Sequence, residues 1–208
     1  MYPNLQIKLE NLLTDKDLTG VEQNKLRQFI GMLTAFISEW FRKTITLIVP
    51  KHEQPFVVSE KAVMEFLKPA MDIEAEKKNQ TPYVDNDMWG WNSFKGKTIP
   101  AMLNELTLAI YRFIKAMTHR QILAEGEAKG IKHIGTYLEA LATIRAGILA
   151  GEVDQRNTGI IAYFKIDGND QLYRFHAWRH DGGQLHVHVN EMDLGNECDP
   201  EDGVCFSN

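Results

Sequence analysis

Three segments before residue 80 show a clear hydrophobic pattern. Residues 20–43 carry apolar side chains at intervals of three and four, which is the period of one helix face. Residues 44–49 are rich in β-branched side chains and end at Pro50, and residues 56–58 follow Pro55, so we expect one or two short strands. Ser59 can cap a second helix that runs to about Lys78.

The middle of the chain predicts two further helices. From Thr98 the apolar residues again recur at intervals of three and four as far as Met117, and the helix is expected to run to about residues 126–130. A second pattern of this kind covers residues 131–149, with Gly151 as its end. Because the link between them is short and contains glycine, we expect an antiparallel helical hairpin.

From residue 158 the period changes to two. Residues 160–166, 171–180 and 184–190 alternate, with turn sequences at Gly168-Asn169 and Gly182-Gly183, which predicts a three-stranded antiparallel meander with two tight turns. The expected fold class is therefore α+β, in a single domain over residues 1–208. Residues 1–157 form a mainly helical body, residues 158–192 the sheet, and residues 193–208 an acidic C-terminal tail.

The charge is unevenly distributed. The 208 residues contain 23 Lys and Arg against 28 Asp and Glu, a net charge of −5. This balance argues against a protein that coats nucleic acid by bulk charge, because such binding depends on neutralised phosphates. After Arg179 there is no basic residue, so the charge is +2 before that point and −7 after it. An acidic end of this kind can dock on a basic partner surface.

The N-terminal segment and the cysteines favour an intracellular protein. The first residues lack the basic and apolar regions of a secretory signal, and no run of about 18 apolar residues predicts a membrane span. We therefore expect a soluble, cytoplasmic protein without a membrane partner. Cys198 and Cys205 are the two cysteines, both near the C-terminus. They cannot hold the fold together, and whether they are free, bonded or metal-bound stays open.

Four of the seven histidines lie in the last two predicted strands, at positions 176, 180, 186 and 188. His186 and His188 are two residues apart, so they share one face of a strand about 6.6 Å apart and could supply two ligands to zinc or iron. The predicted turns place His176 and His180 on the opposite face, unless a bulge shifts the register. The face of His186 and His188 is then shared by Ala162, Phe164, Tyr173, Phe175 and Ala177. The remaining metal donors would be Cys198, Asp199 or Cys205.

Two segments resemble the histidine-triad nucleotide hydrolases and transferases. Residues 47–52 (Leu-Ile-Val-Pro-Lys-His) resemble the strand and Pro-Lys-His segment of that family, and residues 181–190 resemble its glycine-rich approach to alternating histidines. The resemblance implies that His188 is a nucleophile that attacks an α-phosphate and that His186 is its partner. Asn190 stands where the family has a third histidine, and a longer stretch separates the two segments than in the family.

Residues 79–97 predict a long ordered loop with four aromatic residues, which are Tyr83, Trp89, Trp91 and Phe94. Such a loop is usually functional or packed against another surface, because its aromatic side chains would otherwise lie in water. Aromatic side chains are also common anchors of protein interfaces.

These features favour a non-enzymatic interaction or assembly subunit without a cofactor, such as a component of a larger complex or a virus particle, or a regulator that binds a basic surface. Its partner would be another protein or a second copy. The expected contact residues are Tyr83, Trp89, Trp91, Phe94, Glu197, Asp199, Glu201 and Asp202. The alternative is an enzyme that uses His186 and His188, either with zinc or iron or as a histidine nucleophile in phosphate transfer.

Overall fold

The computed structural model describes residues 19–38, 41–78, 80–113, 116–153, 159–166, 168–179, 183–199 and 202–207. The chain divides into two compact units, Met1–Arg42 and Lys43–Asn208. Within the described part of the first unit, helix α2 spans Gly20–Ser38, so the predicted helix is present but ends before residue 43, and residues 41–43 belong to a strand. The hydrogen bond from the Thr19 Oγ1 to Glu22 Oε2, 2.6 Å, lies at the start of this helix.

A seven-stranded mixed sheet forms the centre of the second unit, in the order β1-β5-β11-β7-β8-β9-β3. The pairs β5–β11, β7–β8 and β8–β9 are antiparallel, whereas β7–β11 and β3–β9 are parallel. The seven strands are β1 (Phe41–Val49), β3 (Tyr83–Val84), β5 (Leu106–Phe113), β7 (Gly159–Ile166), β8 (Asn169–Arg179), β9 (Leu185–Glu191) and β11 (Asp202–Ser207). Two smaller ladders pair β2 (Phe56–Val57) with β4 (Thr98–Ile99), and β6 (Met117–Thr118) with β10 (Glu197–Cys198).

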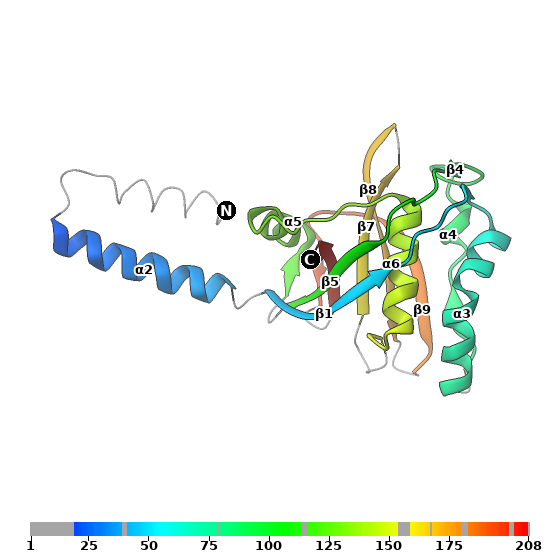
Figure 1. Cartoon of the computed structure of the whole chain (residues 1–208), viewed down its shortest axis with the longest axis horizontal. Helices are drawn as coiled ribbons and strands as arrows, with labels where there is room; N and C mark the ends of the chain where they lie inside the picture. Colours follow the sequence, from blue (N-terminus) through cyan, green and yellow to red (C-terminus); the bar gives the residue numbers. More distant parts are fainter. Residues whose placement is uncertain are drawn as a thin grey trace. The chain divides into compact units, whose positions relative to one another are not determined.

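Helices cover both faces of this sheet. Helix α6 (Tyr137–Leu149) packs on β7 and β8, and α3 (Glu60–Lys78) packs on α6 and on the short helix α4 (Asp87–Gly90), as Figure 1 shows. Helix α5 (His119–Ala128) lies over the other face, where Gly126 approaches the ring of Phe206 in β11. The sheet is therefore enclosed by α6 on one face and partly by α5 on the other.

Local sequence signals explain where α5 and α6 begin. Thr118 and Thr136 each accept a hydrogen bond from the backbone N–H three residues later, and the side chains of Gln121 and Glu139 return a bond to the backbone of the cap residue. This reciprocal capping satisfies N–H groups that the helix itself leaves unpaired. Gly151 has a φ of 78° just after α6, so the predicted glycine stop is confirmed.

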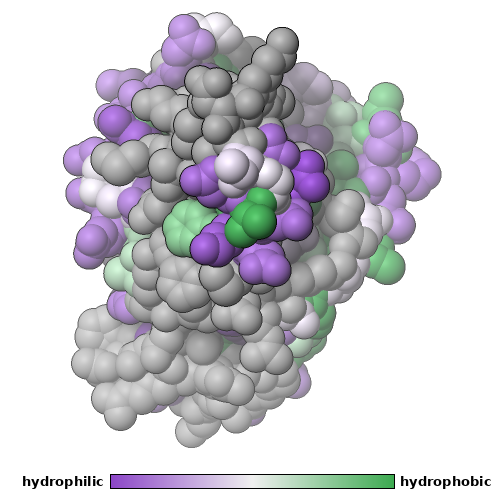
Figure 2. Space-filling view, turned by 90° about the vertical axis from the view of Figure 1, so that its left-hand side faces the viewer, coloured by the Kyte–Doolittle hydropathy of each residue, from purple (hydrophilic) through white to green (hydrophobic). Residues whose placement is uncertain are grey.

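The main core lies between the sheet and α6. One face of each strand points into it, because successive side chains of a strand alternate between the two faces. The strand residues buried in this core are Leu47, Val49, Leu108, Ile110, Ile160, Ala162, Phe164, Ile166, Tyr173, Phe175, Ala177, Leu185, Val187, Val189 and Cys205. On the face of the molecule shown in Figure 2, the described residues are mostly hydrophilic and the hydrophobic ones form small separate areas.

The α+β class is confirmed, but the prediction of a mainly helical body is wrong. Residues 98–113 are predicted as the first half of a helix, but residues 98–99 form β4 and residues 106–113 form β5. Leu108, Ala109 and Ile110 of β5 are buried in succession, so side chains on both faces are covered and the strand contains an apolar run rather than an alternation. Such a run also contains apolar residues at helical spacing, which is why the pattern misleads.

The prediction of an acidic C-terminal tail is also wrong for its last part. Residues 202–207 form β11, which lies inside the sheet and pairs with both β5 and β7. Asp202 is 7% exposed, and Val204, Cys205 and Phe206 are buried. The end of the chain is therefore a central strand, and its negative charge is concentrated in the residues before it.

The predicted meander is present, with one of its two registers correct. Phe164 pairs with Tyr173 and Ala162 with Phe175, which is the register that a turn at Gly168-Asn169 predicts, although Ile166 pairs with Asn169 and the register shifts between Lys165 and Ile166. In the second pair, a two-residue turn at Gly182-Gly183 would place His188 opposite Ala177, but the structure pairs His188 with His176 and His186 with Trp178. This difference of one residue moves every side chain of β9 to the other face relative to β8.

Candidate functional site

The corrected register brings three of the predicted histidines together. His176, His186 and His188 all project from the face of the sheet opposite to α6, and the ring centroids of His176 and His188 are 5.3 Å apart. We expected His176 to point away from the other two, and that expectation is wrong. The structure also separates His186 and His188 from Phe164, Phe175 and their neighbours, which point into the core. His180 lies outside the described residues.

The indole of Trp178 lies in the middle of these histidines. Its ring centroid is 4.9 Å from that of His176, 5.1 Å from His186 and 4.3 Å from His188. An indole offers no metal ligand, and it fills the space that three converging imidazoles would need. Among the described residues, no group of three or more His, Cys, Asp or Glu side chains is arranged to hold a metal ion. Tyr83 extends the aromatic cluster, with its ring 5.1 Å from that of His186.

His176 is held by Asp202 of β11, a contact that the sequence did not reveal. The distance from His176 Nε2 to Asp202 Oδ1 is 3.1 Å, and the two side chains are 13% and 11% exposed. Gly159 is close to both groups. A Cβ atom at this position would be 2.2 Å from Asp202 Oδ1 and 2.6 Å from His176 Nε2, so a larger residue would disturb the contact. When Nε2 donates its proton to the carboxylate, Nδ1 is the nitrogen that can accept one. The contact with Asp202 therefore orients the His176 ring.

His188, the expected nucleophile, is poorly placed for that role. Its Nε2 is enclosed and has no hydrogen-bond partner within the described part of the chain. Burial lowers the pKa of His188 to about 3, and the neighbouring His176, Arg174 and His186 act in the same direction. The imidazole is therefore neutral at physiological pH, and its enclosed nitrogen cannot reach a phosphate in this conformation.

A second, buried cluster surrounds His119 at the start of α5. The Arg174 Nη1 is 2.6 Å from His119 Nε2, and the Tyr163 hydroxyl is 2.8 Å from His119 Nδ1. Because a guanidinium can only donate, Nε2 must accept and the proton of the neutral ring resides on Nδ1. Burial, followed by the nearby Arg174 charge, lowers the pKa of His119 to about 4, so the neutral form persists at physiological pH.

Cys198 belongs to the same cluster, and Cys205 does not. The Cys198 Sγ is 3.2 Å from His119 Nδ1, whereas Cys205 is buried in the core on the α6 side of the sheet. Both thiols are free. Burial raises the pKa of each to about 12, so both stay protonated and neither is a reactive thiolate.

The expected contact residues of the aromatic loop are divided between surface and core. Tyr83 is 48% exposed, and Phe94 is fully buried against Tyr137 and Tyr173. Trp89 and Trp91 are partly buried and pack on the core. Phe94 therefore anchors the loop to the body, and Tyr83 is the aromatic side chain that a partner could reach most easily.

The expected acidic contact residues are divided in the same way. Glu197 and Asp199 are exposed, and Asp202 is buried beside His176. Glu201 lies outside the described residues.

The two segments that resemble the histidine-triad family lie far apart. Residues 47–49 end β1 at one edge of the sheet, and His186 and His188 belong to β9, with four strands between them. At about 4.8 Å per strand, the separation is roughly 24 Å. His52 and His188 therefore do not form one site in this fold.

Helix α2 carries apolar side chains that are exposed. Val21 is 66% and Phe29 is 49% exposed. Residues 28–38 contain no charged side chain. No described helix is both long enough and apolar enough to cross a membrane.

The chain matches no protein-family model, no curated protein and no solved structure.

Proposed function

We propose that the protein is a non-enzymatic subunit of a protein assembly, and that helix α2 makes the contact with a second copy of the chain. The observation that carries the proposal is the exposure of Val21 and Phe29 on a helix of the first compact unit. Isolated helices are only marginally stable in water, and most gain their stability by packing an apolar face on another element. A partner that covers this face would supply that packing.

The composition of α2 favours a second copy as the partner. Residues 28–38 are uncharged, so two such helices can pack without bringing like charges together. Most soluble oligomers are symmetric assemblies of one chain, in which the same surface is used by both subunits. The charged residues Glu22, Lys25 and Arg27 all lie in the first half of the helix, and Lys25 shares a face with Val21 and Phe29, so the proposed contact is centred on Phe29 and the uncharged residues 28–38.

The test is the oligomeric state of the full chain before and after a charge is placed on this face. We expect the wild-type protein to form a dimer or a larger oligomer in sedimentation-velocity experiments, and Phe29→Asp to be monomeric because a buried, unpaired carboxylate is costly. Asn24→Asp is the matched control, since Asn24 is an exposed polar residue of the same helix. It should leave the oligomer intact.

Circular dichroism of each variant separates loss of association from loss of folding. A wild-type chain that stays monomeric at its highest soluble concentration would contradict the proposal. So would a Phe29→Asp chain that is folded and associates as strongly as the wild type.

A further inference from the structure

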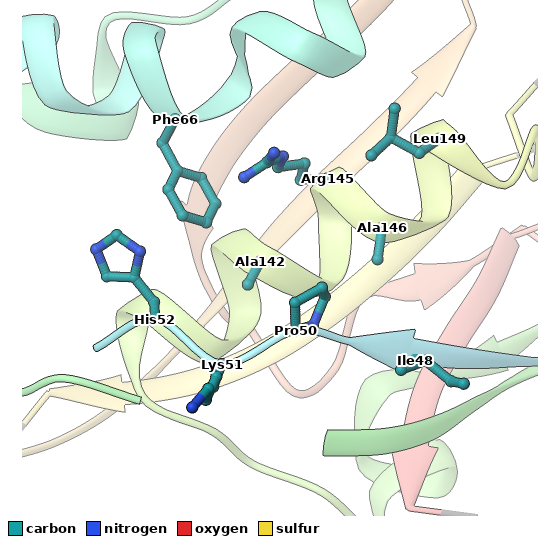
Figure 3. A pocket seen from close by; sticks show the side chains of 9 residues that line it. All are labelled: Ile48, Pro50, Lys51, His52, Phe66, Ala142, Arg145, Ala146 and Leu149. Carbon is teal, nitrogen blue, oxygen red and sulfur yellow. The ribbon is translucent and has the colours of Figure 1, made fainter. Parts of the chain in front are cut away.

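A cleft of about 250 Å³ lies where β1 ends, between β1, α3 and α6 (Figure 3). It is distinct from the histidine cluster, which lies on the other face of the sheet. The nine residues that line it are Ile48, Pro50, Lys51, His52, Phe66, Ala142, Arg145, Ala146 and Leu149. Its volume is slightly below the range of about 300–1,000 Å³ that is usual for ligand sites, so it fits only a small molecule.

The cleft exists because α6 presents small side chains toward β1. Ala142, Arg145, Ala146 and Leu149 follow the spacing of one helix face. The two alanines leave a hollow that larger residues would fill. On the other side, His52 is fixed by backbone hydrogen bonds to Met102 of 2.8 and 2.9 Å. Both walls are therefore set by regular backbone structure.

Arg145 is the polar group at the centre of this hollow. Its guanidinium reaches from α6 toward the ring of Phe66, and Cζ lies 4.9 Å from the ring centroid (Figure 3). Arg145 Nε is enclosed without a hydrogen-bond partner, and no carboxylate forms an ion pair with this arginine in the described part of the chain. An N–H group that is removed from water and lacks an acceptor, as the Nε of Arg145 is here, is costly, since its desolvation is not compensated.

The other side chains make the cleft suitable for an anion with an apolar body. Among the described residues that line the cleft, Lys51 and His52 are the other polar ones, and none is Asp or Glu. Lys51 pairs with Glu53, Nζ to Oε1 at 2.5 Å, and its side chain points away from Arg145 in Figure 3. Arg145 is thus a lining cation that faces the ring of Phe66 and forms no ion pair with a described carboxylate. The remaining wall, from Ile48, Pro50, Leu149 and the alanines, is apolar.

We infer that this cleft binds a small carboxylate that carries an aromatic or aliphatic body. The planar guanidinium of Arg145 matches a carboxylate in geometry and can give it two parallel hydrogen bonds. The apolar wall would cover the body of the ligand. This inference goes beyond the assembly role, because it concerns residues of the body rather than α2.

The first experiment compares ligands that differ in one property at a time, with the full-length protein. Isothermal titration calorimetry with benzoate and hexanoate should give saturable binding of one molecule per chain. Acetate keeps the charge without the body, and benzyl alcohol keeps an aromatic body without the charge. We expect both to bind at least about tenfold more weakly, which corresponds to about 1.4 kcal/mol. The inference is overturned if neither benzoate nor hexanoate binds, or if benzyl alcohol or acetate binds as tightly as they do.

The second experiment tests the residues. Arg145→Gln should weaken benzoate binding at least about tenfold, and Arg145→Lys should give an intermediate loss because the charge remains without the planar fork. Arg120→Gln, at an exposed arginine of α5, is the matched control and should bind as the wild type. Equal affinity of Arg145→Gln and the wild type would overturn the inference.

A third variant tests the cleft without changing Arg145, in case the Arg145 variants do not fold. Ala146→Leu should fill the hollow and prevent binding while the arginine stays in place, whereas Ala128→Leu, at an exposed position of α5, should have no effect. Circular dichroism checks that both fold. The assignment of a small carboxylate to this cleft would be overturned by a folded Ala146→Leu chain that binds benzoate normally. It would also be overturned by a wild-type chain that binds only peptides, through their C-terminal carboxylate.

Discussion

His119 is 1% exposed and accepts a hydrogen bond from a charged arginine, so the fold opposes its protonation. In an unfolded chain its pKa returns to the ordinary value of 6.5, whereas in the folded chain it is about 4. The unfolded state therefore binds more protons between these values, and acid favours unfolding in that range. His188, with a folded pKa of about 3, acts in the same direction.

Above about pH 6.5 these two histidines should contribute no pH dependence to the free energy of unfolding. As the pH is lowered toward 4, we expect the free energy of unfolding to fall. The loss from His119 is on the order of 2 kcal/mol, after allowance for solvent screening. Urea unfolding at a series of pH values measures it. His119→Gln should be less stable at neutral pH and should have a flatter pH profile. An unchanged slope in this variant would mean that other groups cause the acid sensitivity.

The histidine cluster could be predicted only in part from the sequence. The spacing of His186 and His188 correctly places them on one face of a strand. Their position relative to His176 depends on the length of the connection after Arg179, and one residue there reverses the face. Asp202 could not be assigned, because its strand reaches the cluster through a parallel pairing with β7, and parallel partners are distant in sequence.

At the level of elements, the β7–β8 register was predictable, whereas the β8–β9 register and the buried strands were not. The β7–β8 register follows from a turn whose residues are adjacent in the chain. Helix α3 follows from its Ser59 cap and its spacing, whereas α6 begins at Tyr137 and not at the predicted residue 131. Strand β5 is different, because both of its faces are covered and its apolar residues have no single period. Strand β11 is short and follows an acidic segment, so its sequence resembles a solvated tail.

The place of β11 leads to a strong expectation for truncation. A chain that ends at Asp199 loses the strand that joins β5 to β7, so two long strands lose their partner and become edges. It also loses the buried side chains of Val204 and Phe206. We expect this chain to lose cooperative urea unfolding and to aggregate, since the loss approaches the whole stability of a typical domain, roughly 5–15 kcal/mol.

The control for this truncation changes the exposed acidic residues and leaves β11 in place. Glu197→Gln together with Asp199→Asn should alter the free energy of unfolding by less than about 0.5 kcal/mol, because both side chains are exposed. A truncated chain that unfolds cooperatively, with the midpoint of the full chain, would mean that β11 contributes little to the sheet.

At the scale of the whole molecule, the division into two units makes the contribution of α2 measurable. A fragment of residues 41–208 keeps the whole of β1 and all of the elements that follow it. Because the core residues of the sheet and α6 all lie in this fragment, we expect it to fold and to unfold in one cooperative transition. We also expect it to be monomeric, because it lacks the helix that is proposed to associate.

Concentration dependence then distinguishes the two possible roles of α2. Association that occurs only in the folded state raises the melting temperature as the protein concentration increases. The melting temperature of the full chain should therefore rise with concentration, and that of the fragment should not. If the fragment instead fails to fold, α2 would be needed by the body of the same chain. Its apolar residues would then serve folding, and an assembly role for this helix would lose its support.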